Sequence, residues 1–216
     1  MAKVANVLIG KSSGSVGGTT FSSWKGINVL KAKPTVVANP QTDKQKAQRA
    51  AFSFMVGLYR TLVAVIVIGF KELAVKKSQF NAFQSANLKA AFDLSAPPAA
   101  TLLPAEVSIS KGTIADTPID TVVASEAANT VVFNYADTAN DPGQSAGDKP
   151  LMVVFNETKE EWTCKVGAAT RGDGTDSLPM LEGWEEADVL HCYLGFSSVD
   201  GDTASDSQYK AGAIVA

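Results

Sequence analysis

The sequence predicts an α+β protein, in which an N-terminal extended arm and a helical hairpin precede a C-terminal immunoglobulin-like antiparallel β-sandwich. Between Asn39 and Phe92 the apolar residues recur three and four positions apart, which is the period of amphipathic helices. After Ala105 the chain changes to short alternating runs separated by turn residues, which is typical of a sandwich. We therefore divide the chain into an arm (1–38), a helical region (39–95), a Pro-rich linker (96–105) and the sandwich (106–216).

The N-terminal arm is rich in Gly and Ser and then becomes extended. Phe21 and Trp24 fall in stretches that predict one or two short strands. Pro34 and Pro40 predict a stiff, extended lead-in to the first helix. An arm of this kind packs either on a neighbouring subunit or back on its own domain, and the sequence leaves both open.

Thr42 marks the start of the first helix, because Gln45 follows three residues later and completes a capping box. The helix is expected to end between Gly69 and Ala74. Its second half, LVAVIVI (62–68), is β-branched enough that a buried strand is the alternative. A second helix is expected from the turn at 76–78 to about Phe92, before the stretch SAPPAATLLP.

The most apolar window, from Ala50 to Phe70, approaches the length of a membrane span. Ser53, Gly57 and Arg60 interrupt it, so the sequence favours a buried core helix and no membrane contact. The N-terminal apolar run is too short for the core of a signal peptide.

The C-terminal part predicts six or seven strands with hairpin signals at Asn156–Glu157 and Asp200–Gly201. Trp162 and Tyr193 are expected as large aromatics of the core or its rim, and Trp184 as a loop residue that covers one end. The runs that read as strands are 107–114, 121–125, 129–136, 151–166, 188–205 and 207–215.

Charge is divided unevenly along the chain. Residues 1–93 carry thirteen Lys or Arg and three acidic residues, a net charge of +10, whereas residues 94–216 carry six and nineteen, a net charge of −13. The basic half could meet nucleic acid or the acidic half of another copy. We favour the second, because the basic residues are scattered singly and are not clustered with stacking aromatics.

Candidate catalytic and metal-binding residues are few. His191 is the only histidine, which excludes a zinc site with two imidazoles, and we expect it to share a strand face with Tyr193 while Cys192 points the other way. Cys192 and Cys164 fit buried thiols of a reduced, cytoplasmic protein. We expect no enzyme activity, no cofactor and no small-molecule substrate.

Three short motifs receive plain structural interpretations. The run Gly10-Lys11-Ser12 lacks the upstream glycine of a phosphate-binding loop and fits a flexible arm. Arg171-Gly172-Asp173 fits a turn better than an adhesion tripeptide. Asp200, Asp202 and Asp206 fit polar hairpin residues, with a calcium site as the less favoured alternative.

Several segments together resemble an uncharacterised domain family found in Bacteroidetes and in the crAss-like phages that infect them. The segments are GSVGGTTFSSWKG, KPTVVANPQTDKQKAQRAAF, IGFK, FNAFQSANLKAAF, VSISKGTI, LMVVFNETKEEWTCKVGAATR and DVLHCYLGFSSVDGDTASDSQY. The resemblance implies an arm, a helical part, an all-β part and a structural role in the virion, and it offers no catalytic residue. The residues that we expect at assembly contacts are Trp24, Lys25, Gly26, Asn39, Pro40, Arg49 and Arg60.

Two functional hypotheses follow. The first is a non-enzymatic phage virion protein, a ring-forming subunit of the head–tail neck or connector or of the tail, assembled in the host cytoplasm. Its partners would be further copies of itself and neighbouring virion proteins, since unlike surfaces suit closed rings. The second is a cytoplasmic bacterial interaction module that binds a protein or glycan through the sandwich.

Overall fold

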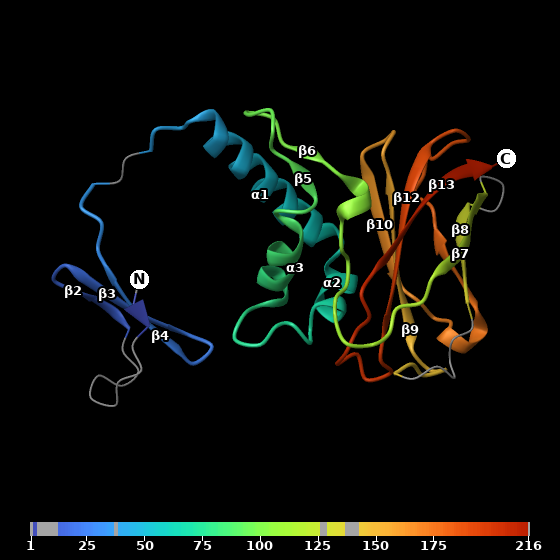
Figure 1. The fold of residues 1–216 in the computed structure, drawn as a ribbon, viewed down its shortest axis with the longest axis horizontal. Helices are drawn as coiled ribbons and strands as arrows, with labels where there is room; N and C mark the ends of the chain where they lie inside the picture. The colour runs from blue at the N-terminus through green and yellow to red at the C-terminus, as the bar shows by residue number, and fades with distance from the viewer. Residues whose placement is uncertain (1, 4–12, 37–38, 126–128, 137–142, 216) are drawn as a thin grey trace.

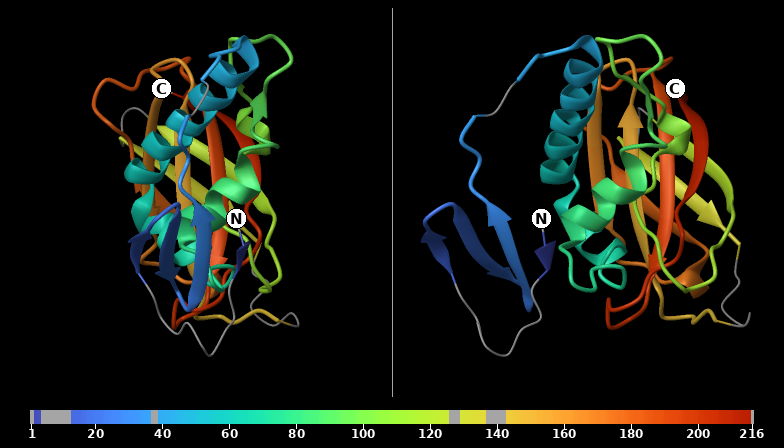
Figure 2. Two further views of the ribbon diagram at one scale, coloured as in Figure 1. Left: turned by 90° about the vertical axis from the view of Figure 1, so that its left-hand side faces the viewer. Right: turned by 60° about the vertical axis from the view of Figure 1, so that its left-hand side comes forward.

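The computed structural model describes residues 2–3, 13–36, 39–125, 129–136 and 143–215, and it shows a mixed α+β fold (Figure 1). The GKS run at 10–12 lies outside the described residues. Helices lie on one face of a two-layered β-structure, and a small N-terminal sheet stands apart from this body (Figure 2). The predicted α+β class is therefore confirmed.

The first helix, α1 (Asp43–Thr61), begins where the capping box predicts. The Gln45 amide donates to Thr42 Oγ1 at 3.4 Å, and the Thr42 amide donates to Gln45 Oε1 at 3.3 Å. The prediction of one continuous helix to Gly69 or beyond is wrong, because the chain bends by 96° between α1 and α2 (Val63–Gly69). The bend turns the β-branched segment so that Val65 and Ile66 are buried in the core shared with β9, β10 and β12.

The segment LVAVIVI is thus helical, and the strand alternative is wrong. The third helix, α3 (Gln79–Asn87), begins after Ser78, whose hydroxyl accepts from the Asn81 amide at 3.1 Å. It ends earlier than predicted. Phe92 belongs to the short strand β5 (Phe92–Asp93), which pairs with β6 (Thr101–Leu102).

The main sheet contains seven strands in the order β10-β9-β12-β13-β7-β8-β11. All neighbours are antiparallel except β13 and β7, which pair in parallel. The strands are β7 (Ile119–Ser125), β8 (Thr130–Tyr135), β9 (Lys149–Asn156), β10 (Glu161–Val166), β11 (Thr175–Pro179), β12 (Val189–Ser197) and β13 (Gln208–Val215).

Both predicted hairpin turns are present, after Asn156 and around Gly201, where φ is 64°. The predicted strand at 107–114 is wrong. This segment is irregular, follows a 3-10 turn (Pro104–Glu106), and makes only an isolated bridge from Ile114 to Ser205 within the described part of the chain.

Strand β9 contributes to two hydrophobic cores because its side chains alternate. Leu151, Val153 and Phe155 face the helices and belong to the first core. Met152 and Val154 point the other way and belong to the second core, together with side chains from β7, β8 and β11. Ala100 and Leu102, from the segment predicted as a linker, pack against the helix-side core. The four-part division of the chain stays a prediction, but the helices and the β-structure share a core.

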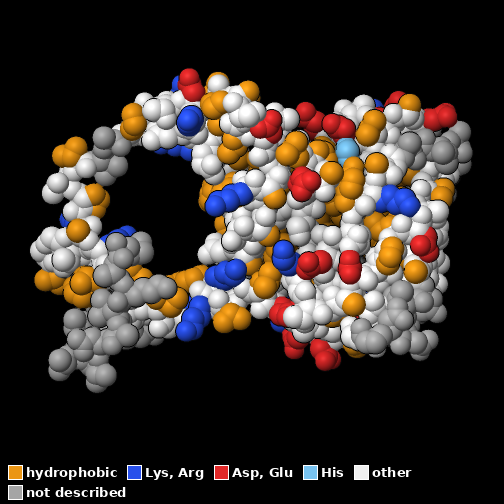
Figure 3. All heavy atoms as spheres, viewed as in Figure 1, with side chains coloured by type: hydrophobic (Ala, Val, Ile, Leu, Met, Phe, Trp, Pro, Cys, Tyr) orange, Lys and Arg blue, Asp and Glu red, His pale blue; other side chains and the backbone are white. Residues whose placement is uncertain are grey.

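The N-terminal sheet is more regular than the one or two strands predicted. Its order is β1-β4-β3-β2, with β1 (Ala2–Lys3), β2 (Gly14–Val16), β3 (Thr19–Trp24) and β4 (Ile27–Ala32) all antiparallel. None of the side chains described in residues 13–36 is buried. Figure 3 shows open space between this sheet and α1.

Candidate functional site

Three of the predicted contact residues lie together at the tip of the β3–β4 hairpin. Lys25 (φ 46°) and Gly26 (φ 75°) form a two-residue turn between Trp24 and Ile27. Positive φ at both positions fits a type I′ turn, which favours glycine. Lys25 Nζ lies 5.5 Å from the centroid of the Trp24 ring and donates to the Lys77 carbonyl at 2.5 Å.

The other four predicted residues lie along the lead-in and α1. Arg49 Nη2 donates to Asn39 Oδ1 at 2.5 Å, which ties the lead-in to the helix. Pro40 is exposed just before the capping box, and Arg60 is exposed in the last turn of α1. The structure therefore gives two separate groups, one at the hairpin tip and one on α1.

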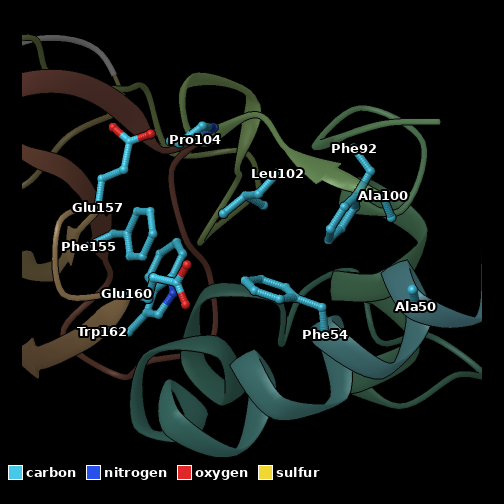
Figure 4. Close-up of a pocket in the computed structure, with 10 residues that line it drawn as sticks. All are labelled: Ala50, Phe54, Phe92, Ala100, Leu102, Pro104, Phe155, Glu157, Glu160 and Trp162. Atoms are coloured by element: carbon cyan, nitrogen blue, oxygen red, sulfur yellow. The ribbon is translucent and has the colours of Figure 1, made fainter. Parts of the chain in front are cut away.

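A pocket of about 480 Å³ opens where α1, the β5–β6 hairpin and the β9–β10 hairpin meet (Figure 4). Its walls are mostly apolar and aromatic. Phe54 and Phe92 meet edge to face with centroids 5.6 Å apart, and Phe155 and Trp162 stack at 4.3 Å. The remaining lining residues are Ala50, Ala100, Leu102, Pro104, Glu157 and Glu160.

Two carboxylates lie on one side of this pocket. Figure 4 shows Glu157 and Glu160 on the side formed by β9 and β10, with Phe92 and Ala50 opposite. Both belong to the turn after Asn156, whose side chain accepts from the Lys159 amide at 3.0 Å. Within the described chain Glu160 forms no ion pair, so the pocket combines aromatic walls with negative charge, a combination that suits a cation.

Stacked rings continue the aromatic wall along the sheet. The His191 ring lies 5.8 Å from Phe155 and 5.8 Å from Tyr209. Its Nδ1 lies 2.8 Å from the Tyr209 hydroxyl and its Nε2 lies 3.0 Å from Glu157 Oε2. His191 is therefore a hydrogen-bonded sheet residue, as predicted, and it fixes Glu157 at the pocket.

Burial changes the acidity of neighbouring hydroxyl and thiol groups. It raises the pKa of the Tyr193 hydroxyl and also that of the Tyr209 hydroxyl. The Tyr193 hydroxyl donates to the Pro104 carbonyl at 2.7 Å and so anchors the pocket rim. Cys192 points to the opposite core, as the strand alternation predicts, and burial raises the pKa of its thiol to about 12.

The sequence interpretation identified Trp162 as an aromatic of the core or rim but missed the pocket. The available signal was Phe54, which falls off the apolar stripe of α1 at Ala51, Met55 and Leu58 and is 40% exposed. The sequence did not predict that Ala100, Leu102 and Pro104 line the pocket, because their Pro-rich segment is typical of a linker.

Other candidate groups have structural roles. Arg171 is fully buried against Asp148 (Nε to Oδ2, 3.2 Å) and over the Phe196 ring, in a 3-10 turn, which fits the predicted turn and leaves no exposed adhesion tripeptide. Asp202 pairs with Lys71 at 2.5 Å, and Asp206 Oδ1 accepts from the Gly112 amide at 3.1 Å. No cluster of three or more His, Cys, Asp or Glu side chains suited to a metal occurs among the described residues.

Trp184 lies in a loop and is buried at one end of the β-structure, as predicted. Its Nε1 donates to Glu161 Oε2 at 2.9 Å. In the part of the chain that the structure describes, no single helix has the length and apolarity to cross a membrane; only α1 and α2 taken together do, and they are bent at their junction.

The fold and the pocket define a mixed α+β protein whose helices cover one sheet face and frame an aromatic, acid-rimmed pocket at their edge. The chain belongs to the family of unknown function DUF6266, which matches residues 10–211. Membership of an uncharacterised family, inferred above from the sequence motifs, is thus confirmed over nearly the whole chain. No curated protein and no solved structure matches the chain.

Proposed function

We propose that this chain is a non-enzymatic structural subunit that assembles with copies of itself, with its N-terminal sheet covered by a neighbouring copy. The observation that carries the proposal is the exposure of that sheet. A sheet gains stability by packing a face against another layer, and a few strands without such a layer are marginal in water.

The N-terminal sheet has apolar side chains for such a layer, and none of its side chains that the structure describes is buried. Phe21 and Leu30 are paired on one face, and Trp24 and Ile27 are paired on the other. Val16 is 71% exposed and Trp24 is 48% exposed. Covering these side chains with a second chain would stabilise the sheet by about 25 cal/mol for each Å² of apolar surface removed from water.

The uneven distribution of charge along the chain supports a second copy as the layer that packs on the N-terminal sheet. Residues 1–42 contain five lysines and no acidic residue, whereas residues 94–216 carry a net charge of −13. Opposite surfaces on one chain favour head-to-tail contacts, which close into rings when the rotation permits.

The proposed setting is a phage particle, where the chain would form a ring in the head–tail neck or the tail after assembly in the host cytoplasm. The proposal for the β-part is an immunoglobulin-like sandwich. Its support is the arrangement of seven strands, with β7, β8 and β11 packed across a core from β10, β9, β12 and β13. In such an assembly the sandwich would decorate the ring.

Oligomeric state tests the proposal directly. We expect light scattering and native mass spectrometry to show the full chain as a multimer that dissociates on dilution. Hydrogen exchange should show the amides of Thr19–Ala32 gaining protection as the concentration rises, while the amides of β9 stay unchanged because they are already buried in the body.

Two outcomes would count against it. A chain that stays monomeric at high concentration would contradict self-assembly and would favour the alternative, a module that binds a protein or glycan through the sandwich. Absence of the chain from purified phage particles, measured by mass spectrometry, would contradict the virion setting alone.

A further inference from the structure

We infer that the pocket between α1, the β5–β6 hairpin and the β9–β10 hairpin receives the Trp24–Lys25 tip of a second copy of this chain. This inference rests on the proposed self-assembly and adds where the arm docks. The tip supplies one aromatic ring and one cation, and the pocket supplies aromatic walls and two carboxylates.

The pocket has the size and chemistry for such a tip. Its volume of about 480 Å³ lies in the range of sites that enclose a large side chain or a small ligand. The Phe155–Trp162 stack and the Phe54–Phe92 pair offer ring faces and edges on opposite sides. A further ring between them would gain edge-to-face or offset contacts, worth about 0.5–1.5 kcal/mol beyond burial.

The hairpin tip is preorganised for binding in a pocket. A two-residue turn holds Trp24 and Lys25 in a defined geometry, so little conformational freedom is lost on binding. In its own chain, Lys25 Nζ of the tip donates to the carbonyl of Lys77 in the body. In the pocket Lys25 would exchange this neutral acceptor for Glu157 or Glu160, and hydrogen bonds between charged groups are stronger.

The tip that fills the pocket belongs to another copy. In its own chain the tip lies beside Lys77, in the turn between α2 and α3. The pocket lies at the opposite end of the helical layer, beside the middle of α1 and the strands β5 and β6 (Figures 1 and 4).

A second apolar hollow, on the outer face of α1, is a poorer site for this tip. It is lined by Phe52, Val56, Ser53, Gln48 and Arg49, and it contains no carboxylate. The charged residues of the arm are all basic. Arg49 in the hollow would therefore repel Lys25 of the tip, whereas Glu157 and Glu160 in the pocket would attract it. Charge therefore selects the pocket over the hollow.

Photo-crosslinking of the full chain locates the tip. Trp24 is replaced by the photoreactive residue p-benzoylphenylalanine, and this variant is mixed with an equal amount of isotopically labelled unsubstituted chain before illumination. We expect mass spectrometry, with fragment ions that assign the linked residue, to find links between copies from position 24 to Phe54, Leu102 or Trp162. Links to the Phe52 hollow, or to any other surface, would overturn the inference while leaving self-assembly intact.

Charge exchange provides a second test. We expect Lys25→Glu, and separately the pair Glu157→Lys with Glu160→Lys, to weaken assembly by at least about tenfold, and we expect the three substitutions together to recover most of the loss. Lys31→Glu, and separately the pair Asp120→Lys with Asp200→Lys, make the same charge changes at exposed positions outside the tip and the pocket lining, and they serve as matched controls.

The results separate the two proposals. An unsubstituted chain that never assembles contradicts both the proposed function and the inference. An assembling chain in which the charge exchange fails to restore affinity, or in which the controls weaken assembly equally, contradicts the pocket and leaves the structural role standing.

Discussion

The side chain of Asn87, at the end of α3, forms reciprocal hydrogen bonds with the backbone of Ser108. The Ser108 amide donates to Asn87 Oδ1 at 2.7 Å, and Asn87 Nδ2 donates to the Ser108 carbonyl at 2.9 Å and to the Phe83 carbonyl at 3.0 Å. One fully buried amide therefore holds the irregular segment 107–110 against the helices.

Asn87→Ala should destabilise the fold by about 1–3 kcal/mol, because it leaves partly buried backbone groups of Ser108 without their Asn87 partners. Urea denaturation monitored by circular dichroism measures the change. Asn81→Ala, at an exposed position of the same helix, is the control and should stay within about 0.5 kcal/mol of the unsubstituted chain. Equal effects of the two substitutions would show that helix propensity, and not the Ser108 contact, governs stability.

Arg171→Met should cost about 3–5 kcal/mol, because Asp148 would remain as a buried, uncompensated charge. Burial lowers the pKa of Arg171, and Asp148 opposes this shift by favouring the charged guanidinium. Thermal and urea unfolding measure the loss. Lys46→Met removes the exposed pair with Asp43 and should change stability by less than about 1 kcal/mol. A small effect of Arg171→Met would mean that the buried pair is dispensable.

Stability should fall at alkaline pH because of Cys192. Burial raises the pKa of this thiol to about 12, above about 8.5 for an unfolded chain, so the unfolded state loses its proton first and stability declines as pH rises above about 8.5. Between pH 8.5 and 9.5 the free energy of unfolding should drop by about 1 kcal/mol more than in Cys192→Ala. If the free energy of unfolding fell equally with pH in the unsubstituted chain and in Cys192→Ala, the loss of stability would not come from Cys192.

Gly69→Ala should destabilise the protein by about 1–3 kcal/mol, because a Cβ there would lie 2.7 Å from the Ile109 carbonyl oxygen and 2.8 Å from Ser110 Cβ. Gly57→Ala, in α1, meets nothing within 4 Å and should stabilise the helix by about 0.5–1 kcal/mol. The pair separates close packing from helix propensity in one denaturation experiment. Stabilisation by both substitutions would contradict the close approach at Gly69.

Local features of the fold could be predicted because they depend on neighbouring residues. The Thr42–Gln45 capping box, the turn after Asn156 and the opposite orientation of Cys192 and Tyr193 all follow from short-range geometry. The bend at Leu62 could not be predicted in the same way. It depends on where the sheet lies relative to α1, which periodicity does not encode.

The pocket was missed for a related reason. It joins Phe54, Leu102 and Trp162 from three distant segments, and only their packing shows that they meet. Besides Phe54, a second signal was available: the run LMVVF in β9 is apolar at every position, which indicates a strand covered on both faces. It would have predicted that the helices pack on the sheet.

Strand β9 lines both hydrophobic cores, so exposing one core to water would also disturb the other. The helices and the seven-stranded sheet are therefore expected to unfold together as one cooperative unit. The N-terminal sheet shares no described buried side chain with that unit. Substitutions in the arm are therefore expected to leave the stability of the helices and the main sheet unchanged.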